Sequence, residues 1–272
     1  MSCLILMMNC VRLVITVTEF KIMFPILFKL GPITLHTYGL LVSIAFLVVL
    51  KLAIKQANKE GISSDCILDL SFYSLLAAIV GARIFFVILD PDFFSDPRDI
   101  YRVWQGGLVF YGGFIGAFVV GFWYIKKHNL PLWQTLDIFT PSLAIGQAIG
   151  RLGCLMAGCC HGKECHLPWA ITFSNKNSLA PLGVPLHPTQ LYSSLQGALI
   201  FLILINVRRK KPFHGFLVCL YIFLYSIFRF IVEIFRGDPR GFIFKQMFST
   251  SQVVSLILFP LGIFLFFYLK RE

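Results

Sequence analysis

The stretch Tyr38–Gln56, YGLLVSIAFLVVLKLAIKQ, decides the fold class of this chain. Apart from Lys51 and Lys55 it carries no charged residue, and most of its side chains are large and apolar. A helix of about 20 apolar residues is long enough to cross the roughly 30 Å hydrocarbon core of a bilayer. The stretch therefore predicts a membrane-spanning helix rather than a helix of a soluble core.

Six further stretches share this length and apolar character, and the composition of the whole chain agrees with them. Of the 272 residues, 57% are hydrophobic and 14% are charged. A chain of this composition has more apolar surface than a soluble domain of this size can bury. The six further stretches are 67–89, 108–125, 134–151, 191–207, 215–235 and 248–269. Together with the first stretch, they predict an all-α membrane protein, a seven-transmembrane helix bundle. No linker separates them, so residues 23–272 are expected to form a single transmembrane domain, and residues 1–22 are left as an uncertain N-terminal extension.

The basic residues predict how the chain lies in the membrane. The net charge of +11 comes from short Lys and Arg clusters between the apolar stretches, such as Arg208–Lys211, a pattern that favours membrane topology over nucleic-acid binding. Alternate connections carry these clusters, which places the start of the first helix in the periplasm and the C-terminus in the cytoplasm of a bacterium. The connection at about 152–190 would then form a small periplasmic head of a multi-pass inner-membrane protein.

Ionisable residues within the predicted spans mark a candidate site, because charge in a membrane interior is costly and usually functional. Those that lie toward the outward ends of their helices are Arg83, Arg151, Arg229, Glu233 and Arg236. One interpretation is structural: Arg229 and Glu233 form an ion pair, and the other arginines reach the membrane surface with their side chains. The other is functional: the arginines outnumber the acid, and guanidinium groups suit phosphate, so the site would bind the head group of a phospholipid.

Glycines are concentrated in two of the predicted helices. Gly112, Gly113 and Gly116 lie in YGGFIGA, and similar spacing recurs around Gly150. Small residues at this spacing usually allow close helix packing. They would also let a lipid approach the backbone beside Tyr111, and the two roles are compatible.

Four cysteines cluster in and after the segment GRLGCLMAGCCHG, residues 150–162. Cys154, Cys159, Cys160 and Cys165 lack the C-x2-C pairs of structural zinc sites, and no metal ligand is assigned. Disulfides would suit an oxidising periplasm, although the adjacent Cys159 and Cys160 rarely bridge each other. A nucleophilic thiol beside a guanidinium is the remaining alternative.

Four segments together resemble the bacterial prolipoprotein diacylglyceryl transferase family, from about residue 23 to the end. They are LGPITLHTYGL (30–40), GGLVFYGGFIGA (106–117), GRLGCLMAGCCHG (150–162) with LHPTQLY (186–192), and RFIVEIFRGD (229–238). The resemblance implies transfer of the diacylglyceryl group of phosphatidylglycerol to the lipobox cysteine in the signal peptide of a prolipoprotein. A thioether forms, glycerol phosphate leaves, and no cofactor is needed.

The resemblance also implies roles for individual residues. Arg151 matches the arginine of the family's GR-x-G signature, and Arg229 matches the essential arginine of its penultimate helix, so both are expected to hold the lipid phosphate. Tyr38 matches a tyrosine at the family's cavity, and Gly162 matches a signature glycine. His187 lies in the family's HP-x-QLY stretch.

This chain departs from the family pattern at three positions. Many members have His where this chain has Tyr111, and that His is a proposed base. Cys154 and Cys159 replace residues that are usually Asn and often acidic, which indicates a cysteine-bearing branch. Catalysis is thus assigned to Tyr111, Arg151 and Arg229. Substrate binding is assigned to Tyr38, Arg83, Gly112, Gly113, Gly162, His187, Glu233 and Arg236.

Two other function classes use some of the same residues. A transporter for an anionic solute would need the intramembrane arginines, but such proteins usually show inverted repeats or helices broken at the midplane. A membrane thiol oxidoreductase would need a redox-active C-x-x-C, which the chain lacks. The set of motifs therefore favours the transferase.

Overall fold

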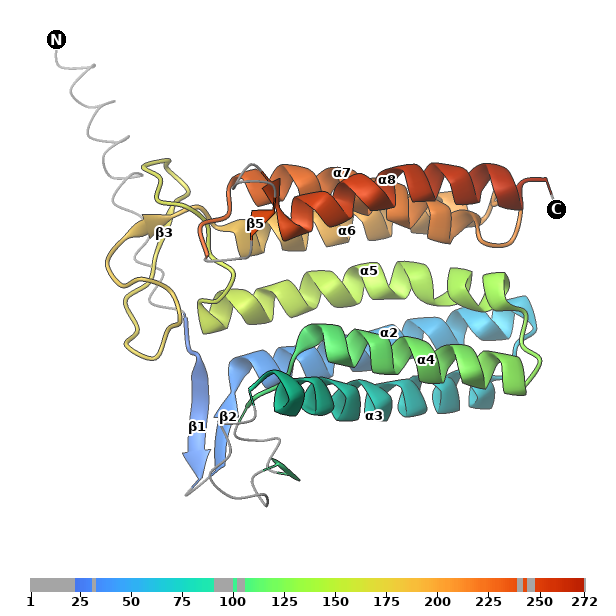
Figure 1. The fold of residues 1–272 in the computed structure, drawn as a ribbon, viewed down its shortest axis with the longest axis horizontal. Helices are drawn as coiled ribbons and strands as arrows, with labels where there is room; N and C mark the ends of the chain where they lie inside the picture. Colours follow the sequence, from blue (N-terminus) through green and yellow to red (C-terminus); the bar gives the residue numbers. More distant parts are fainter. Residues whose placement is uncertain are drawn as a thin grey trace, which may run out of the picture. The chain divides into compact units, whose positions relative to one another are not determined.

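The computed structural model describes residues 23–30, 33–90, 100–101, 106–238, 242–243 and 248–271. This part of the chain is mostly helical, with seven helices and three pairs of short strands (Figure 1). The predicted N-terminal extension, residues 1–22, lies outside the described residues, as does most of the connection 90–107.

Each of the seven predicted stretches corresponds to one helix. The helices are α2 (Thr37–Glu60), α3 (Ser64–Leu89), α4 (Phe110–Lys127), α5 (Leu132–Ala157), α6 (Thr189–Arg208), α7 (Phe216–Ile234) and α8 (Thr250–Leu269). Five of them, α2, α3, α6, α7 and α8, are long and apolar enough to cross a membrane. The prediction of a multi-pass membrane protein is thereby supported, while the count of seven spans stays a prediction.

Helices α4 and α5 are not among these five, although each has at least 18 residues. Helix α4 ends in Lys126 and Lys127 and contains several glycines. Helix α5 carries Asp137 and Arg151 and has Pro141 in its interior. Both features lower the mean hydropathy without shortening the helix.

One face of α4 nevertheless has the character of a lipid-facing surface. Phe110, Phe114, Phe118 and Phe122 follow one another at four-residue spacing, with successive ring centroids 6.3–6.4 Å apart. All four rings are exposed, from 42% to 77% of their surface. A continuous exposed aromatic stripe is unfavourable in water and suits contact with lipid.

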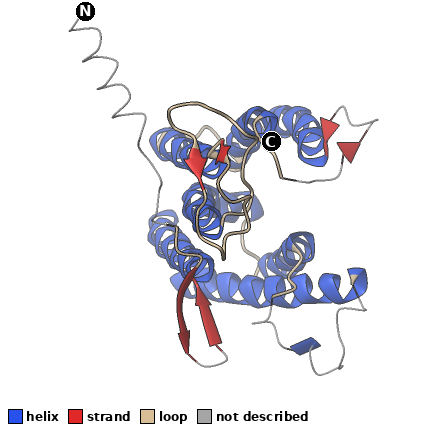
Figure 2. Ribbon diagram, turned by 90° about the vertical axis from the view of Figure 1, so that its left-hand side faces the viewer, coloured by secondary structure: helices blue, strands red, loops and turns tan. Residues whose placement is uncertain are grey.

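The all-α prediction is incomplete, because some segments outside the helices form short antiparallel strand pairs, drawn in red in Figure 2. Strand β1 (Ile26–Leu30) pairs with β2 (Ile33–His36), directly before α2. Strand β3 (Ile171–Thr172) pairs with β4 (Pro185–Leu186). Strand β5 (Phe242–Ile243) pairs with β6 (Phe248–Ser249). Pairing satisfies backbone groups that lie outside the helices, a requirement that hydropathy does not show.

The chain forms two compact units, which we describe separately. The second unit, Leu50–Ile138, contains α3 and α4. These helices pack through small residues: a Cβ atom built on Gly112 would lie 2.4 Å from the Gly81 carbonyl oxygen, and one built on Gly116 would lie 2.3 Å from that of Ala77. Close backbone packing of this kind is what glycine permits between membrane helices.

The first unit, Met1–Val49 with Phe139–Glu272, contains the candidate site. Helices α6, α7 and α8 lie side by side in it (Figure 1), and Ala144 of α5 packs with apolar residues of α6 and α7. The segment between α5 and α6 has a small apolar core of its own. It joins Met23 and Leu155 to residues of the strand pair β3–β4 and its loop: Ile171, Phe173, Ala180 and Leu186.

Candidate functional site

The polar face of α7 centres on a buried ion pair between Arg229 and Glu233. Arg229 Nη2 lies 2.8 Å from Glu233 Oε2, and the two residues are only 8% and 7% exposed. The start of α8 completes the pair: Arg229 Nη2 donates to Ser251 Oγ at 2.9 Å, and Ser249 Oγ donates to Glu233 Oε1 at 3.0 Å. This ion pair is the one considered in the structural interpretation of the sequence, whereas the two serines were not predicted.

Ser249 has a second role, which explains why it lies in this place. Its side chain accepts a hydrogen bond from the backbone N–H of Gln252, whose side chain in turn accepts from the backbone N–H of Ser249. This capping box starts α8 and fixes the position of Ser249 beside Glu233. Helix initiation and the anchoring of the buried carboxylate therefore depend on the same residue.

Arg236 is held by a partner that the sequence analysis did not identify. Its Nε and Nη2 atoms donate to the two carboxylate oxygens of Asp238 at 2.9 and 3.0 Å, a bidentate pair. Glu233, the expected partner, is farther away, with Oε2 3.8 Å from Arg236 Nε. Burial opposes the charge of Arg236, but the hydrogen bond to Asp238 and the neighbouring Cys160 raise its pKa above the ordinary value.

Arg151, in the last turns of α5, differs from the other two arginines. Its side chain is half-buried, and among the described residues it has neither a hydrogen-bond partner nor an ion-pair partner. It interacts electrostatically with Arg229, and also with Tyr38 of α2 and Tyr221 of α7. Within the described part of the chain, Glu233 therefore pairs with Arg229 and Asp238 with Arg236, while no carboxylate pairs with Arg151.

Tyr38 is close to the same helix end. A Cβ atom built on Gly153 would lie 3.1 Å from the Tyr38 ring, so the glycine allows the tyrosine to pack against the GR-x-G turn of α5. The ring interacts electrostatically with Arg151 and with Cys154, and it is 45% exposed. The structure thus brings Tyr38, Arg151 and Arg229 together in one unit, and their shared role at the lipid phosphate stays a prediction.

Gly162 lies where three chain segments meet. It donates to the His187 carbonyl at 3.0 Å and forms a bridge with Arg236, while Gly237 donates to the His161 carbonyl. A Cβ atom on Gly162 would lie 2.4 Å from the Cβ atom of His187, too close for any side chain. The structural reason for a glycine here is therefore close packing of the segment after α5 against the ends of α7 and β4.

His187 is part of a small polar and aromatic group. Its Nδ1 atom lies 3.3 Å from the hydroxyl of Tyr192, which also accepts a hydrogen bond from the Trp169 indole N–H at 2.8 Å. Trp169 and Tyr192 also line an open, largely apolar cavity of about 600 Å³ that the sequence analysis did not predict. The other lining residues come from the start of α6: Pro188, Leu191, Ser194, Leu195 and Ala198.

The first residues of α6 also hold the cysteine-rich turn. Thr189 Oγ1 donates to the Cys160 carbonyl at 2.7 Å, and Gln190 Nε2 donates to the Cys159 carbonyl at 2.8 Å. Both side chains are 1% exposed, so these bonds are shielded from water. Gln190, which belongs to the HP-x-QLY stretch, therefore has a positioning role.

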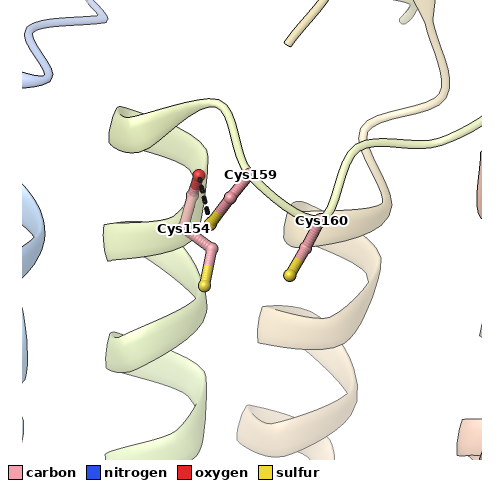
Figure 3. A group of neighbouring side chains, drawn as sticks. All are labelled: Cys154, Cys159 and Cys160. Carbon is pink, nitrogen blue, oxygen red and sulfur yellow. Dashed lines mark hydrogen bonds between the residues drawn. The ribbon is translucent and has the colours of Figure 1, made fainter. Parts of the chain in front are cut away.

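Three thiols come together at this turn. Cys154, Cys159 and Cys160 point toward one another, and the Cys159 thiol donates to the Cys154 carbonyl oxygen at 3.8 Å (Figure 3). Hydrogen bonds from Cys154 and Cys159, together with Arg236, lower the pKa of Cys160. Hydrogen bonds to Cys154 and Cys160, with burial, raise the pKa of Cys159. Cys165 is buried but does not belong to this group.

The remaining predicted residues belong to the second unit. Tyr111 is 61% exposed on the first turn of α4, with its ring edge against Phe110. Arg83 is 6% exposed and donates to the carbonyls of Ile100, Gly106 and Gly107, so it holds the chain before α4.

Gly112 and Gly113 are also in the second unit, and they face α3. A Cβ atom on Gly112 would lie 2.5 Å from the Cβ atom of Phe85, and one on Gly113 would lie 3.0 Å from the Ala78 carbonyl oxygen. The packing role considered for these glycines is therefore the one observed. Their role in substrate binding, like those of Tyr111 and Arg83, stays a prediction.

Comparison with known proteins agrees with the resemblance seen in the motifs. Residues 25–268 match the model of a family described as prolipoprotein diacylglyceryl transferase. A phosphatidylglycerol–prolipoprotein diacylglyceryl transferase of Clostridium tetani is 36% identical over 242 residues, which cover 89% of this chain and 96% of that protein. The enzyme of the same name from Finegoldia magna is 38% identical, covering 90% and 95%, and that of Bacillus velezensis is 33% identical, covering 91% and 93%.

Proposed function

Because this chain belongs to the prolipoprotein diacylglyceryl transferase family, we propose that it moves the diacylglyceryl group of phosphatidylglycerol onto a prolipoprotein. The acceptor is the thiol of the lipobox cysteine in the signal peptide. The unpaired guanidinium of Arg151, beside the buried Arg229, is the observation that best supports this function in the described structure. Neither the transporter nor the thiol oxidoreductase gains support from the comparisons.

The reaction is a nucleophilic displacement at a carbon of the lipid's glyceryl group. The sulfur of the acceptor cysteine forms a bond to this carbon, and the bond between the carbon and the phosphate oxygen breaks. The bonding electrons leave with glycerol phosphate, and the thiol proton is released. Negative charge therefore grows on the phosphate in the transition state, where fixed cations lower the barrier most.

Arg151 is assigned the contact with the phosphate. It is half-buried, where an ionic interaction is stronger than in bulk water, and no described carboxylate competes for it. The guanidinium group offers planar paired N–H donors that match two phosphate oxygens. Binding of an anion would also offset the repulsion between Arg151 and Arg229.

Arg229 is assigned a supporting role on the same anion. Its contacts with Glu233 and Ser251 both use Nη2, and a guanidinium has five N–H donors in total. The pair with Glu233 fixes its orientation and reduces the cost of burying it. Arg236 acts less directly, because its bidentate pair with Asp238 holds it at the junction with Gly162.

The membrane orientation and Tyr111 complete the proposal. With the C-terminus in the cytoplasm, the segment 152–190 and the arginine cluster face the outside, where secreted preproteins emerge. Tyr111 stands at the position of the family's histidine. Its proposed role is to accept the proton of the acceptor thiol or to form a hydrogen bond with the substrate. The inner membrane of a bacterium is the proposed location.

One assay tests the function directly. The full chain, purified in detergent, is incubated with phosphatidylglycerol labelled in its acyl chains and a lipobox peptide, and the peptide is examined by mass spectrometry. The expected result is a thioether-linked diacylglyceryl adduct with release of glycerol phosphate. A peptide whose lipobox cysteine is replaced by serine is the control. No adduct with the cysteine peptide, in protein that remains folded, would refute the proposal.

A further inference from the structure

The three thiols of the cysteine-rich turn form a group that the transfer reaction does not use. The sulfur atoms of Cys154, Cys159 and Cys160 all lie within 4.8 Å of one another. Cys154 belongs to the last turn of α5, and the other two follow that helix directly. The fold thus brings together three side chains whose spacing in the sequence, C-x4-C-C, did not predict a set of metal ligands.

The local backbone is shaped to produce this convergence. Gly158 has a φ of +77°, and Cys160, which is not a glycine, has a φ of +60°. A left-handed conformation is unfavourable for a residue with a side chain and persists only where its surroundings enforce it. Here the carbonyls of Cys159 and Cys160 are bound by Gln190 and Thr189. The turn is therefore held in the form that directs both thiols back toward Cys154 (Figure 3).

The distances fit a metal ion better than a single disulfide. Thiolate–zinc bonds of about 2.3 Å place tetrahedral sulfur ligands about 3.8 Å apart, so an approach of at most about 1 Å would bring these three into position. A disulfide would use two of the sulfurs at about 2 Å and leave the third unpaired. Three thiolates also leave one position open on a tetrahedral ion.

The charges around the thiols favour an anionic metal complex. Three thiolates around a divalent ion carry a net charge of about −1. The Arg236 side chain hydrogen-bonds Cys160, and Arg151 interacts electrostatically with Cys154. Cations that contact ligand atoms stabilise such a complex and orient its ligands.

We propose that Cys154, Cys159 and Cys160 bind one thiophilic metal ion of the Zn²⁺ class through three thiolates. When the metal ion binds, the three thiols release their protons to solvent and become thiolate ligands. No electron transfer is involved. The ion would fasten the end of α5 to the segment that precedes Gly162. The proposal does not rest on the transfer reaction, so it can be tested whether or not the proposed activity is found.

Cadmium provides the direct test, because thiolate–Cd²⁺ bonds absorb in the ultraviolet. The full chain is purified in detergent, reduced, stripped with a chelator and titrated with Cd²⁺ without oxygen. We expect saturation at one ion per chain, and loss of the absorption when Zn²⁺ is added in competition. Cys66→Ser, which removes a half-buried thiol from the other unit, is the matched control and should titrate unchanged.

Variants of the cluster decide the assignment. The triple variant Cys154→Ser/Cys159→Ser/Cys160→Ser should lose the Cd²⁺ absorption. Cys160→Ser alone should bind the metal at least about tenfold more weakly, because even the loss of a residue that only hydrogen-bonds a metal ligand has an effect of this size. If the triple variant does not fold, the thermal midpoint replaces the titration: at the same Zn²⁺ concentration, the rise in the midpoint should be smaller in Cys160→Ser than in the original chain.

Three results would overturn the proposal. The first is a Cd²⁺ signal that is equal in the triple variant and the original chain. The second is a folded, reduced chain that shows no signal at all. The third is a disulfide among the three cysteines in the chain as isolated from the membrane, detected by alkylation without reduction followed by mass spectrometry.

Discussion

Asp238 binds Arg236 through both carboxylate oxygens, with Oδ1 2.9 Å from Nε and Oδ2 3.0 Å from Nη2. This pair changes how the positive charge of the site is understood. Glu233 pairs mainly with Arg229, and Asp238 pairs with Arg236. Among the described residues, no carboxylate pairs with the half-buried Arg151. The division separates one arginine that is available for an anion from two that are held in place.

Removal of the Asp238 charge is expected to destabilise the protein. In Asp238→Asn the buried Arg236 loses its charged bidentate partner. We expect the free energy of unfolding to decrease by about 2–3 kcal/mol. This loss is smaller than the largest losses known for buried ion pairs, because Asp238 is partly exposed. Denaturant unfolding in detergent measures it. Glu164→Gln, at an exposed carboxylate, is the control and should have little effect. Equal stability of Asp238→Asn and the original chain would show that the pair is not important for the fold.

Arg151→Ala is expected to abolish transfer while the protein remains folded. Loss of a fixed donor to a developing anionic charge typically costs about 10²–10³-fold in turnover. The transfer assay with labelled phosphatidylglycerol measures the rate, and thermal unfolding shows whether the fold is intact. Arg209→Ala removes an exposed arginine at the end of α6 and should retain activity. An Arg151→Ala variant with unchanged turnover would exclude Arg151 from phosphate binding.

Tyr111→Phe tests the proposed role of the tyrosine at the start of α4. It removes only the hydroxyl, and the exposed ring at the start of α4 can keep its contact with Phe110. If Tyr111 takes the proton or donates an essential hydrogen bond, turnover should fall by about 10²-fold or more. Tyr101→Phe, another exposed tyrosine, is the control. Full turnover of Tyr111→Phe would rule out both roles.

Gly162→Ala is expected to impair folding rather than chemistry. Its new methyl group would lie 2.4 Å from the Cβ atom of His187 and 2.8 Å from the Phe235 carbonyl oxygen, so backbone must shift. Overpacking of this kind costs about 1–3 kcal/mol. The thermal midpoint should fall together with the yield of folded protein. Gly39→Ala, where an added Cβ meets nothing within 4 Å, should be tolerated, and equal behaviour of the two variants would contradict the packing role of Gly162.

The sequence by itself determined the helical architecture. Hydropathy is a property of consecutive residues, and the bilayer sets the length that an apolar helix needs, so all seven helices could be located before the structure was known. The pair Arg229–Glu233 was also predictable, because residues four apart lie on one face of a helix. The motifs around Arg151 indicated the family, which the comparisons confirmed.

Contacts between distant segments were decided only by the tertiary structure. Ser249 and Ser251 reach the ion pair of α7 because α8 packs beside it, and the apolar cavity at Trp169 forms where the segment after α5 meets α6. The three thiols converge because a left-handed turn is held by Thr189 and Gln190, about thirty residues farther along the chain. Such partners depend on the path of the chain in space, since separation along the sequence does not specify which surfaces meet when helices pack.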